Sequence, residues 1–508
     1  MTAAHGGARG ADQSPSGMPR DDGDASGAGL RAGRGGQGRP PHLAGPPSDV
    51  FGAVIDEVHG LLSEEVGGVV AQVRGMTIGA LGLPVSIGAR CAIQTRRGGV
   101  LEAEVVGVSG GQTLLSVFGE PTGVAPGDRV WCTAGVPRVP VGFDLLGRVI
   151  DSQGRALDHR PEPKLNVRYP LHRLAPAAMA RRQIDEPLGL GVRSLDGLLT
   201  AGRGQRLGIF AGTGVGKSVL LGMLCRHTQA DVNVVCLVGE RGREVGDFIR
   251  NQLGSEGLAR SVVVVCTSDA APALRVRACL HATAIAEYFR DQGRDVLLLM
   301  DSLTRFAMAQ RQIGLAAGEP PTAKGYPPSV FALLPRVLER AGRTQQGSIT
   351  GLYTVLVEGD DIDEPLADAV RGILDGHIWL SRSLANRGHY PAVDVLGSIS
   401  RVADDVVDAE HQRAARAVRR VLAVWHDIED LVSIGAYVPG ANLDYDVAVQ
   451  MREAIAAFLQ QDRHTGVTFG ESSAALKALG QQIAETRERL TRNGAGSPPA
   501  RPARAAAR

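Results

Sequence analysis

The residues with the clearest chemistry lie in one stretch, QRLGIFAGTGVGKSVLLGMLC, at positions 205–225. Its glycines can adopt left-handed backbone conformations and bring main-chain N–H groups close to an anion. Lys217 can reach the outer phosphates of a nucleotide, and the hydroxyl of Ser218 can ligate Mg²⁺. The pattern therefore predicts a phosphate-binding loop, made of Ala211, Gly212, Thr213, Gly214, Val215, Gly216, Lys217 and Ser218.

Such a loop must be positioned by a strand before it and a helix after it. Arg206 to Phe210 is typical of a short apolar strand, and Val219 to Cys225 is typical of the first turns of a buried helix. The start of that helix adds unpaired N–H groups and the positive end of a dipole. Because both flanking elements are present, the sequence favours a nucleotide site over a chance Gly-rich turn.

Two carboxylates follow apolar strands elsewhere in the chain. Asp301 closes VLLLMD and could hold Mg²⁺ through water while accepting a hydrogen bond from Ser218, or it could cap the helix that starts at Ser302. Glu240 follows VNVVCLVG and could polarise the water that attacks a γ-phosphate, or it could be a solvated loop charge. The phosphate loop favours the Mg²⁺ role for Asp301, whereas spacing alone leaves both interpretations of Glu240 open.

The composition limits the class of protein. A chain of 508 residues with 44% hydrophobic residues is long enough for two or three domains. The formal net charge of +1 gives no general argument for binding nucleic acid or an anionic membrane. The six cysteines form no C-x-x-C pair, and no apolar run approaches the roughly 18 residues that span a bilayer. Together with the absence of an apolar signal segment, these features predict a soluble cytoplasmic protein.

The pattern along the chain predicts five segments. Short β-type runs give way to apolar strands alternating with helices, which indicates a mostly parallel α/β sheet, and then to helical periodicity. The two ends are rich in Gly, Pro, Ala and Arg, which predicts disorder. The expected segments are a disordered extension at 1–48, a β-barrel domain at 49–140, a central α/β domain with the phosphate loop at 141–402, a helical domain at 403–490 and a disordered tail at 491–508.

The chain resembles the flagellum-specific export ATPases and the closely related virulence type III secretion ATPases, which are cousins of rotary ATP synthase subunits. The resemblance covers roughly residues 49–490. It is carried by FAGTGVGKSVLLGML, LVGERGREVGDFI, LLLMDSLTRFAMAQR, GEPPTAKGYPPSVFALLPRVLERAG, VLVEGDDIDEPLADAVRGILDGHIWLSR and GHYPAVDVLGSISR. The family implies a RecA-like P-loop NTPase core between a small β-barrel and a helical C-terminal domain, with ATP and Mg²⁺ as substrate and cofactor.

The resemblance also implies a role for individual residues. Glu240 matches the catalytic carboxylate, Arg241 a phosphate-sensing arginine, and Asp301 the Walker B aspartate. Tyr390 of GHYP matches the aromatic side chain that packs on adenine, although a core tyrosine is the alternative. Arg401 of SISR matches the arginine finger that a neighbouring subunit inserts.

Such a finger is worth on the order of 10³–10⁵ in rate. Arg382 and Arg387 are the alternatives for the finger if the register of the match differs. Because this single chain carries both the Glu240 carboxylate and the Arg401 finger, the match implies a homohexameric ring with equivalent sites at its own interfaces.

The family further implies a set of partners. They are a central coiled-coil stalk, export substrate–chaperone complexes, the membrane proteins of the export gate, and a stator-like regulatory dimer that binds near the N-terminus. The protein would then be cytoplasmic and peripherally associated with the inner membrane at the export apparatus. No nucleic acid partner is expected.

Several alternatives remain open at this level. The wording FAGTGVGKSVLLGM favours the flagellar branch over the virulence branch. A rotary ATP synthase catalytic subunit is disfavoured by the segment GEPPTAKGYPPSVF. A hexameric RNA translocase would need a basic, aromatic platform in the barrel, where only separated aromatics such as Phe118 and Trp131 occur. A non-enzymatic relative is disfavoured because Lys217, Glu240 and Asp301 are intact.

Overall fold

The computed structural model describes residues 66–357 and 364–494. The predicted extension at 1–48 lies outside this range, and so does the predicted tail from residue 495 onward. Residues 491–494 belong to the last helix, α13 (Phe469–Gly494), instead of the tail. Within the described residues, no helix is both long enough and apolar enough to cross a membrane.

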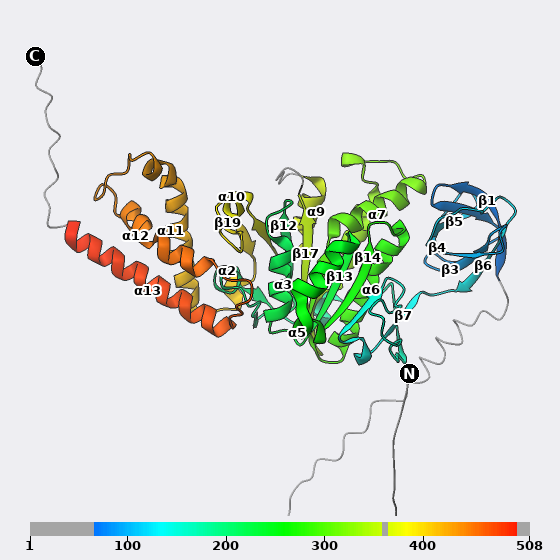
Figure 1. Ribbon diagram of the computed structural model, residues 1–508, viewed down its shortest axis with the longest axis horizontal. Coiled ribbons are helices and arrows are strands. Elements are labelled where there is room, and N and C mark those ends of the chain that lie inside the picture. The colour runs from blue at the N-terminus through cyan, green and yellow to red at the C-terminus, as the bar shows by residue number, and fades with distance from the viewer. Residues whose placement is uncertain (1–65, 358–363, 495–508) are drawn as a thin grey trace, which may run out of the picture. The chain divides into compact units, whose positions relative to one another are not determined.

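The first described part is a closed β-barrel, as the sequence predicts (Figure 1). Its strands hydrogen-bond in the order β1-β2-β5-β4-β3-β6, so that no strand is left with an unpaired edge. The strands are β1 (Gly67–Arg74), β2 (Thr77–Leu81), β3 (Arg90–Gln94), β4 (Val100–Ser109), β5 (Gln112–Val117) and β6 (Arg129–Ala134).

The central part is a mostly parallel sheet with the order β19-β18-β12-β17-β15-β13-β14-β8. Its inner strands are continuous apolar runs such as VVVVC, as expected where both faces of a sheet are covered. The strands are β8 (Arg148–Asp151), β12 (Arg206–Ala211), β13 (Val232–Glu240), β14 (Ser261–Thr267), β15 (Asp295–Asp301), β17 (Ser348–Leu356), β18 (Gly376–Leu380) and β19 (Val393–Ser400), with β16 (Gly342–Arg343) paired to β17.

Helices cover both faces of this sheet, and successive residues of one strand pack to opposite sides. In β12, Ile209 belongs to one apolar cluster with Leu221 of α3, and Phe210 belongs to a second cluster with Ile285 of α6. The helices of this part are α2 (Arg193–Leu198), α3 (Lys217–His227), α4 (Gly242–Asp247), the π-helix η3 (Phe248–Leu253), α5 (Gly254–Ala259), α6 (Pro272–Asp291), α7 (Leu303–Ala316), α8 (Pro328–Leu338), α9 (Pro365–Ile373) and α10 (Arg382–Asn386).

Short elements complete this part of the chain. They are the strands β7 (Arg138–Val141), β9 (Val167–Pro170), β10 (Pro187–Leu188) and β11 (Ala201–Gly202), and the 3₁₀ turns η1 (Phe143–Leu145), η2 (Ala178–Ala180), η4 (Ala323–Gly325) and η6 (Ala403–Asp405). The pairs β7–β9 and β10–β11 are both antiparallel.

The edge strand β19 runs antiparallel to β18, and Ser400 pairs with Gly376. Because β18 is parallel to β12, the carboxyl end of β19 lies at the amino end of its neighbours. The sequence of β19 is VDVLGSIS, and its Leu396 side chain is exposed.

The C-terminal part consists of three long helices, α11 (Ala409–Ser433), α12 (Leu443–Leu459) and α13, as the apolar periodicity predicts (Figure 1). Asp408 and Asn442 cap the first two helices by accepting from main-chain N–H groups. Apolar side chains from all three pack with α2 into one cluster that includes Val418, Met451 and Leu476.

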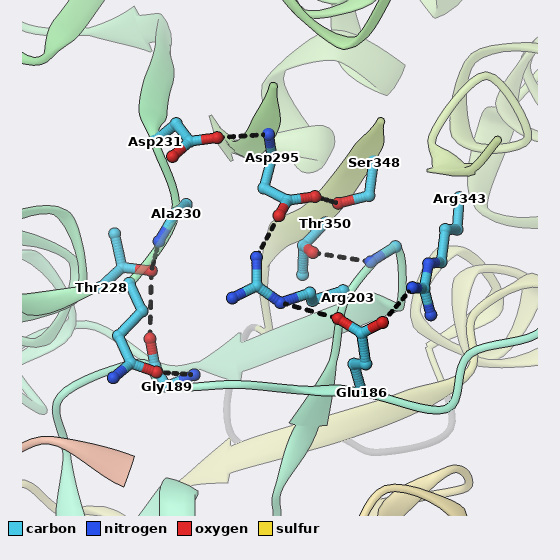
Figure 2. A network of polar contacts seen from close by, with 12 residues as sticks. Glu186, Gly189, Arg203, Thr228, Ala230, Asp231, Asp295, Arg343, Ser348 and Thr350 are labelled. Atoms are coloured by element: carbon cyan, nitrogen blue, oxygen red, sulfur yellow. Dashed lines mark hydrogen bonds and ion pairs between the residues drawn. The ribbon is translucent and has the colours of Figure 1, made fainter. Parts of the chain in front are cut away.

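A network of polar side chains lies at the amino ends of the parallel strands (Figure 2). The Asp295 carboxylate accepts from Ser348 at 2.6 Å and forms an ion pair with Arg203. Glu186 bridges Arg203 and Arg343 at 3.7 and 2.5 Å. These contacts connect Glu186 and Arg203, which precede β12, with the strands β15, β16 and β17. They lie at the edge of the sheet opposite the glycine-rich loop.

A second ion pair is fully buried. The Arg340 guanidinium donates to both Glu287 oxygens at 2.9 and 2.7 Å and to the carbonyl of Leu171 at 2.9 Å, and the two side chains are 2% and 0% exposed. Their charges depend on each other, because neither has access to water.

Removal of one partner should therefore destabilise the central domain strongly. We expect Glu287→Ala to lower its free energy of unfolding by about 3–5 kcal/mol, because the Arg340 charge stays buried without its carboxylate. Urea denaturation followed by circular dichroism measures the loss. Glu488→Ala, which removes an exposed partner of Arg492 on α13, is the control and should shift the midpoint little. Equal shifts for both variants would contradict the argument.

Candidate functional site

The glycine-rich loop has the conformation that an anion site requires. Gly214 and Gly216 have φ values of 78° and 88°, in the left-handed region that side chains disfavour. Gly216 is the residue before α3, whose first residue is Lys217. Val215 is 1% exposed and anchors the loop in the core, while Thr213, Gly214 and Ser218 face solvent. The strand–loop–helix arrangement predicted from the sequence is confirmed.

Lys217 lies between the two predicted carboxylates. Its Nζ donates to Asp301 Oδ1 at 2.5 Å and lies 3.7 Å from Glu240 Oε1. The three side chains come from the start of α3 and from the carboxyl ends of β13 and β15. All three are largely buried, with side-chain exposures of 13%, 17% and 6% for Lys217, Glu240 and Asp301. The fold therefore brings together residues that are far apart in the sequence.

Asp301 is held by a second donor. The Thr354 hydroxyl of β17 donates to the same oxygen at 2.6 Å. Ser302 caps α7 by accepting from the N–H of Arg305, so the alternative reading of Asp301 as a helix cap is not what the structure has. Among the described residues, Asp301 Oδ1 accepts from Lys217 and Thr354, and the expected hydrogen bond from Ser218 is not formed.

Burial and, to a smaller extent, the nearby Asp301 carboxylate raise the pKa of Glu240, while Lys217 lowers it, and the net result is a pKa of about 7. A carboxyl group with a pKa close to neutrality can accept a proton from water and release it again at physiological pH. Glu240 is also the last residue of β13, so a rigid strand fixes its direction. These features suit a general base or a water-orienting group.

Tyr390 lies directly beside the loop. A Cβ placed on Gly216 would come within 3.3 Å of the Tyr390 ring, so the two are in contact. The tyrosine is 46% exposed, which argues against the alternative reading of a core residue. Its ring is therefore available to a flat apolar group that enters next to the phosphate loop.

Two predicted arginines are not part of this cluster. The Arg241 side chain is 82% exposed and contacts Glu244 at 3.4 Å. Arg401 follows β19 and donates its main-chain N–H to Asp375 at the amino edge of the sheet. It lines a groove of ≈ 480 Å³ together with Leu198, Arg416 and Arg419. Of the two alternatives for the finger, Arg387 forms an ion pair with Glu429 at 2.5 Å, and Arg382 opens α10.

One cation near Glu240 was missed in the sequence reading. Arg305 lies in the first turn of α7, and its side chain packs against Gly239, where a Cβ would come within 2.8 Å of it. Its Nε is buried and has no hydrogen-bond partner among the described residues. A buried donor without a partner among the described residues is suited to an acceptor such as a phosphate oxygen. No local sequence pattern marks this residue, because its contact with Gly239 joins positions that are 66 residues apart.

The donors present fit a magnesium ion held mainly by substrate. Mg²⁺ prefers oxygen ligands and is usually bound through one or two protein groups together with phosphates and water. Ser218 and Asp301 supply such oxygens, and the part of the chain that the structure describes contains no group of three or more His, Cys, Asp or Glu side chains able to hold a metal alone.

Family models match three parts of this chain. The nucleotide-binding domain of the ATP synthase alpha/beta family matches residues 191–400, and its beta-barrel domain matches residues 70–134. The type III secretion EscN ATPase C-terminal domain matches residues 407–478. These matches agree with the barrel, the parallel sheet and the helical part of the structure, and the predicted fold class is confirmed.

Individual relatives are similar over most of their length. The chain is 52% identical over 414 residues to a flagellum-specific ATP synthase of Bacillus subtilis, covering 81% of this chain and 94% of that one. It is 52% identical over 395 residues to a type 3 secretion system ATPase of Xanthomonas euvesicatoria, covering 78% and 89%.

A solved structure of the assembled ATPase EscN from enteropathogenic E. coli is similar in sequence and in fold. It has a TM-score of 0.76 and 43% identity, and the match covers 81% of this chain and 100% of that one. A second structure, of EscN with its central stalk EscO, has a TM-score of 0.75 and 42% identity, with coverages of 81% and 100%.

Replacing the Glu240 carboxylate should abolish most of the turnover. We expect Glu240→Gln to lower kcat for ATP hydrolysis by about 10²–10⁴-fold while ATP still binds, because the amide cannot accept the proton. Steady-state phosphate release and nucleotide binding at equilibrium measure the two effects. Asp247→Asn, a carboxylate in the following helix that bonds Asn251, should leave both unchanged. Near-normal turnover of Glu240→Gln would rule out the base.

Proposed function

This chain belongs to the ATP synthase alpha/beta family, within its branch of flagellum-specific and type III secretion ATPases, and we propose that it hydrolyses ATP to power type III protein export. The observation that carries the proposal is the meeting of Lys217, Glu240 and Asp301 beside the phosphate loop. Hydrolysis would be coupled to the release of chaperones and the delivery of unfolded substrates to the export gate.

Each residue has a defined part in the hydrolysis. The loop N–H groups and Lys217 bind the β- and γ-phosphates, and this draws Lys217 away from Asp301 and Glu240. The freed Asp301, together with Ser218, is then able to hold a metal, which when bound neutralises charge on the phosphates. Glu240 orients a water for in-line attack and accepts its proton, while Tyr390 packs against the base. The phosphate-sensing role of Arg241 stays a proposal from the resemblance, since its side chain is exposed and contacts Glu244. Arg305, which packs on Gly239, is proposed as a second phosphate contact.

We propose that Arg401 acts in the site of a neighbouring chain, and the sheet topology supports this proposal. Its strand, β19, ends at the amino edge of the sheet, whereas the phosphate loop follows the carboxyl end of β12. A strand of six residues such as β12 spans about 20 Å. Arg401 therefore lies too far from the phosphate loop of its own chain, and its groove between α2 and α11 opens to solvent.

A homohexamer of this chain would bring Arg401 of one chain to the phosphate loop of the next. Every chain carries the phosphate loop and Glu240 on one face and the proposed Arg401 finger on a different face. In a closed ring with head-to-tail interfaces, each interface would therefore contain one complete site, and all sites would be equivalent. The assembled form of the related EscN supports this proposal. Activity per chain should then depend on assembly.

The C-terminal helices offer a surface for a stalk protein. The turn between α11 and α12 exposes three apolar side chains, Leu431, Ile434 and Val438, which are 42%, 75% and 64% exposed. Large exposed apolar side chains grouped on one turn are typical of an interaction site. Since the related EscN is known in complex with a central stalk, we assign this turn to a coiled-coil partner. Chaperone complexes, the export gate at the inner membrane and a stator-like dimer are proposed as further partners.

Mixing two inactive variants tests the shared site. Lys217→Ala removes the phosphate-loop cation, and Arg401→Ala should lower kcat about 10³–10⁵-fold. In mixed rings, about one quarter of the interfaces would pair an intact loop with an intact finger, so part of the activity should return. Phosphate release from the mixture measures the recovery. Arg387→Ala is the matched control and should remain active alone. A mixture no more active than its components would contradict a finger supplied by the neighbour.

We propose further that the chain belongs to the flagellar branch, and the sequence motif FAGTGVGKSVLLGM supports this proposal. Flagellar and virulence relatives are equally similar, at 52% identity each. In the source organism, a chromosomal Lys217→Ala substitution should abolish swimming, because hook and filament subunits would not be exported. Motility in soft agar measures it, with Asp247→Asn as the control strain. Normal swimming combined with a loss of secreted effector proteins would assign the chain to a virulence system instead.

A further inference from the structure

The segment between α12 and α13 reaches the base side of the nucleotide site. Its second residue, Gln461, donates its main-chain N–H to the carbonyl of Tyr390 at 3.0 Å. The neighbouring Gln460 side chain contacts Nδ1 of His389 at 3.3 Å. Tyr390, whose ring packs on Gly216, is therefore fixed through its main-chain carbonyl by the C-terminal helical part of the chain.

The side chain of Gln461 is fully engaged in hydrogen bonds. Its Oε1 accepts from the N–H of Arg193 at 2.9 Å, and its Nε2 donates to the carbonyls of Gly191 and Thr465 at 2.8 and 2.7 Å. Gln461 is 8% exposed. A side chain that supplies one acceptor and two donors at this length is found only in glutamine. Its amide thus joins the segment before α2 to the turn that precedes α13.

The same segment also contacts the far end of the phosphate-loop helix. Arg226, in the last turn of α3, donates to the carbonyl of Arg463 at 2.5 Å. The next residue, His227, packs so closely on Gly466 that a Cβ there would lie 2.4 Å from its ring. Both ends of α3 are therefore linked to residues 460–466, at one end through Tyr390 and Gly216 and at the other directly.

We propose that Gln461 is a positioning residue for the nucleotide base, which fixes Tyr390 against the phosphate loop and makes base affinity depend on the C-terminal helices. The proposal rests on the proposed function, because it takes Tyr390 as the contact for the base. Among the described residues, the hydrogen bonds of Gln461 go to Gly191, Arg193, Tyr390 and Thr465. None of them goes to Lys217, Glu240 or Asp301, so the proposal concerns the base.

The isosteric variant Gln461→Glu tests this directly. It removes both Nε2 donors and places a carboxylate oxygen against the carbonyls of Gly191 and Thr465, which repels them and displaces the segment. We expect KM for ATP to rise about 10-fold while kcat at saturating ATP stays within about twofold, the pattern of lost binding without lost transition-state stabilisation. Inhibition by inorganic tripolyphosphate, which has no base, should be unchanged.

Two further variants keep the outcome interpretable. Gln450→Glu changes an exposed glutamine of α12 that bonds Arg489 and should have wild-type kinetics. Gln461→Met, which keeps the length without the charge, should also raise KM, and it serves if Gln461→Glu does not fold. An unchanged KM for ATP in a folded Gln461 variant, or an equal loss of tripolyphosphate binding, would overturn the proposal.

A double-variant comparison separates this proposal from the function it rests on. Tyr390→Ala should raise KM for ATP by itself, and adding Gln461→Glu to it should raise KM no further, because the second residue acts through the first. If Tyr390→Ala leaves KM unchanged, the role of Tyr390 as base contact fails. If both variants act independently, Tyr390 keeps its role and the positioning role of Gln461 is overturned.

Discussion

The site depends on one buried cation shared between two carboxylates. Lys217 bonds Asp301 directly and lies close to Glu240, and the three groups have little access to water. Two carboxylates at such close quarters would repel each other without Lys217, and the raised pKa of Glu240 is one sign of this. Phosphates can replace the carboxylates as partners of Lys217, and this exchange would free Asp301 for a metal and Glu240 for water. Nucleotide binding and assembly of the catalytic groups are thereby the same event.

The topology of the sheet adds a second constraint. The strands that carry Glu240 and Asp301 end at one edge, and the antiparallel strand β19 delivers Arg401 to the other. No rotation of a side chain can cover the length of a strand, so Arg401 cannot reach the phosphate loop of its own chain, and the proposed finger role requires a second copy of the chain. The rate of any catalysis that needs the proposed finger would then depend on contacts between copies of the chain. Such a dependence suits an enzyme that works within an export assembly.

Much of the site could be predicted from local sequence, and the exceptions have a common physical cause. The phosphate loop and the carboxylates that follow apolar strands were identified because strand–loop–helix patterns are short-range, and parallel strands meet at a shared edge. Thr354, Arg305 and Gln461 were missed because their contacts join residues 53, 66 and 71 positions apart, respectively, through packing that no local period encodes. The direction of β19 could not be predicted from the local sequence either, because it is set by the pairing of β19 with β18.

The most direct test of this account is a structure of the assembled protein with Mg²⁺, ADP and a metal fluoride that mimics the transferred phosphate. The account predicts that Lys217 leaves Asp301 for the phosphates, that Glu240 contacts the attacking water, and that Arg401 from an adjacent copy reaches the fluoride. If Arg401 instead stays at the amino edge of its own sheet in every copy, or Lys217 keeps its bond to Asp301 with the analogue bound, the account is wrong.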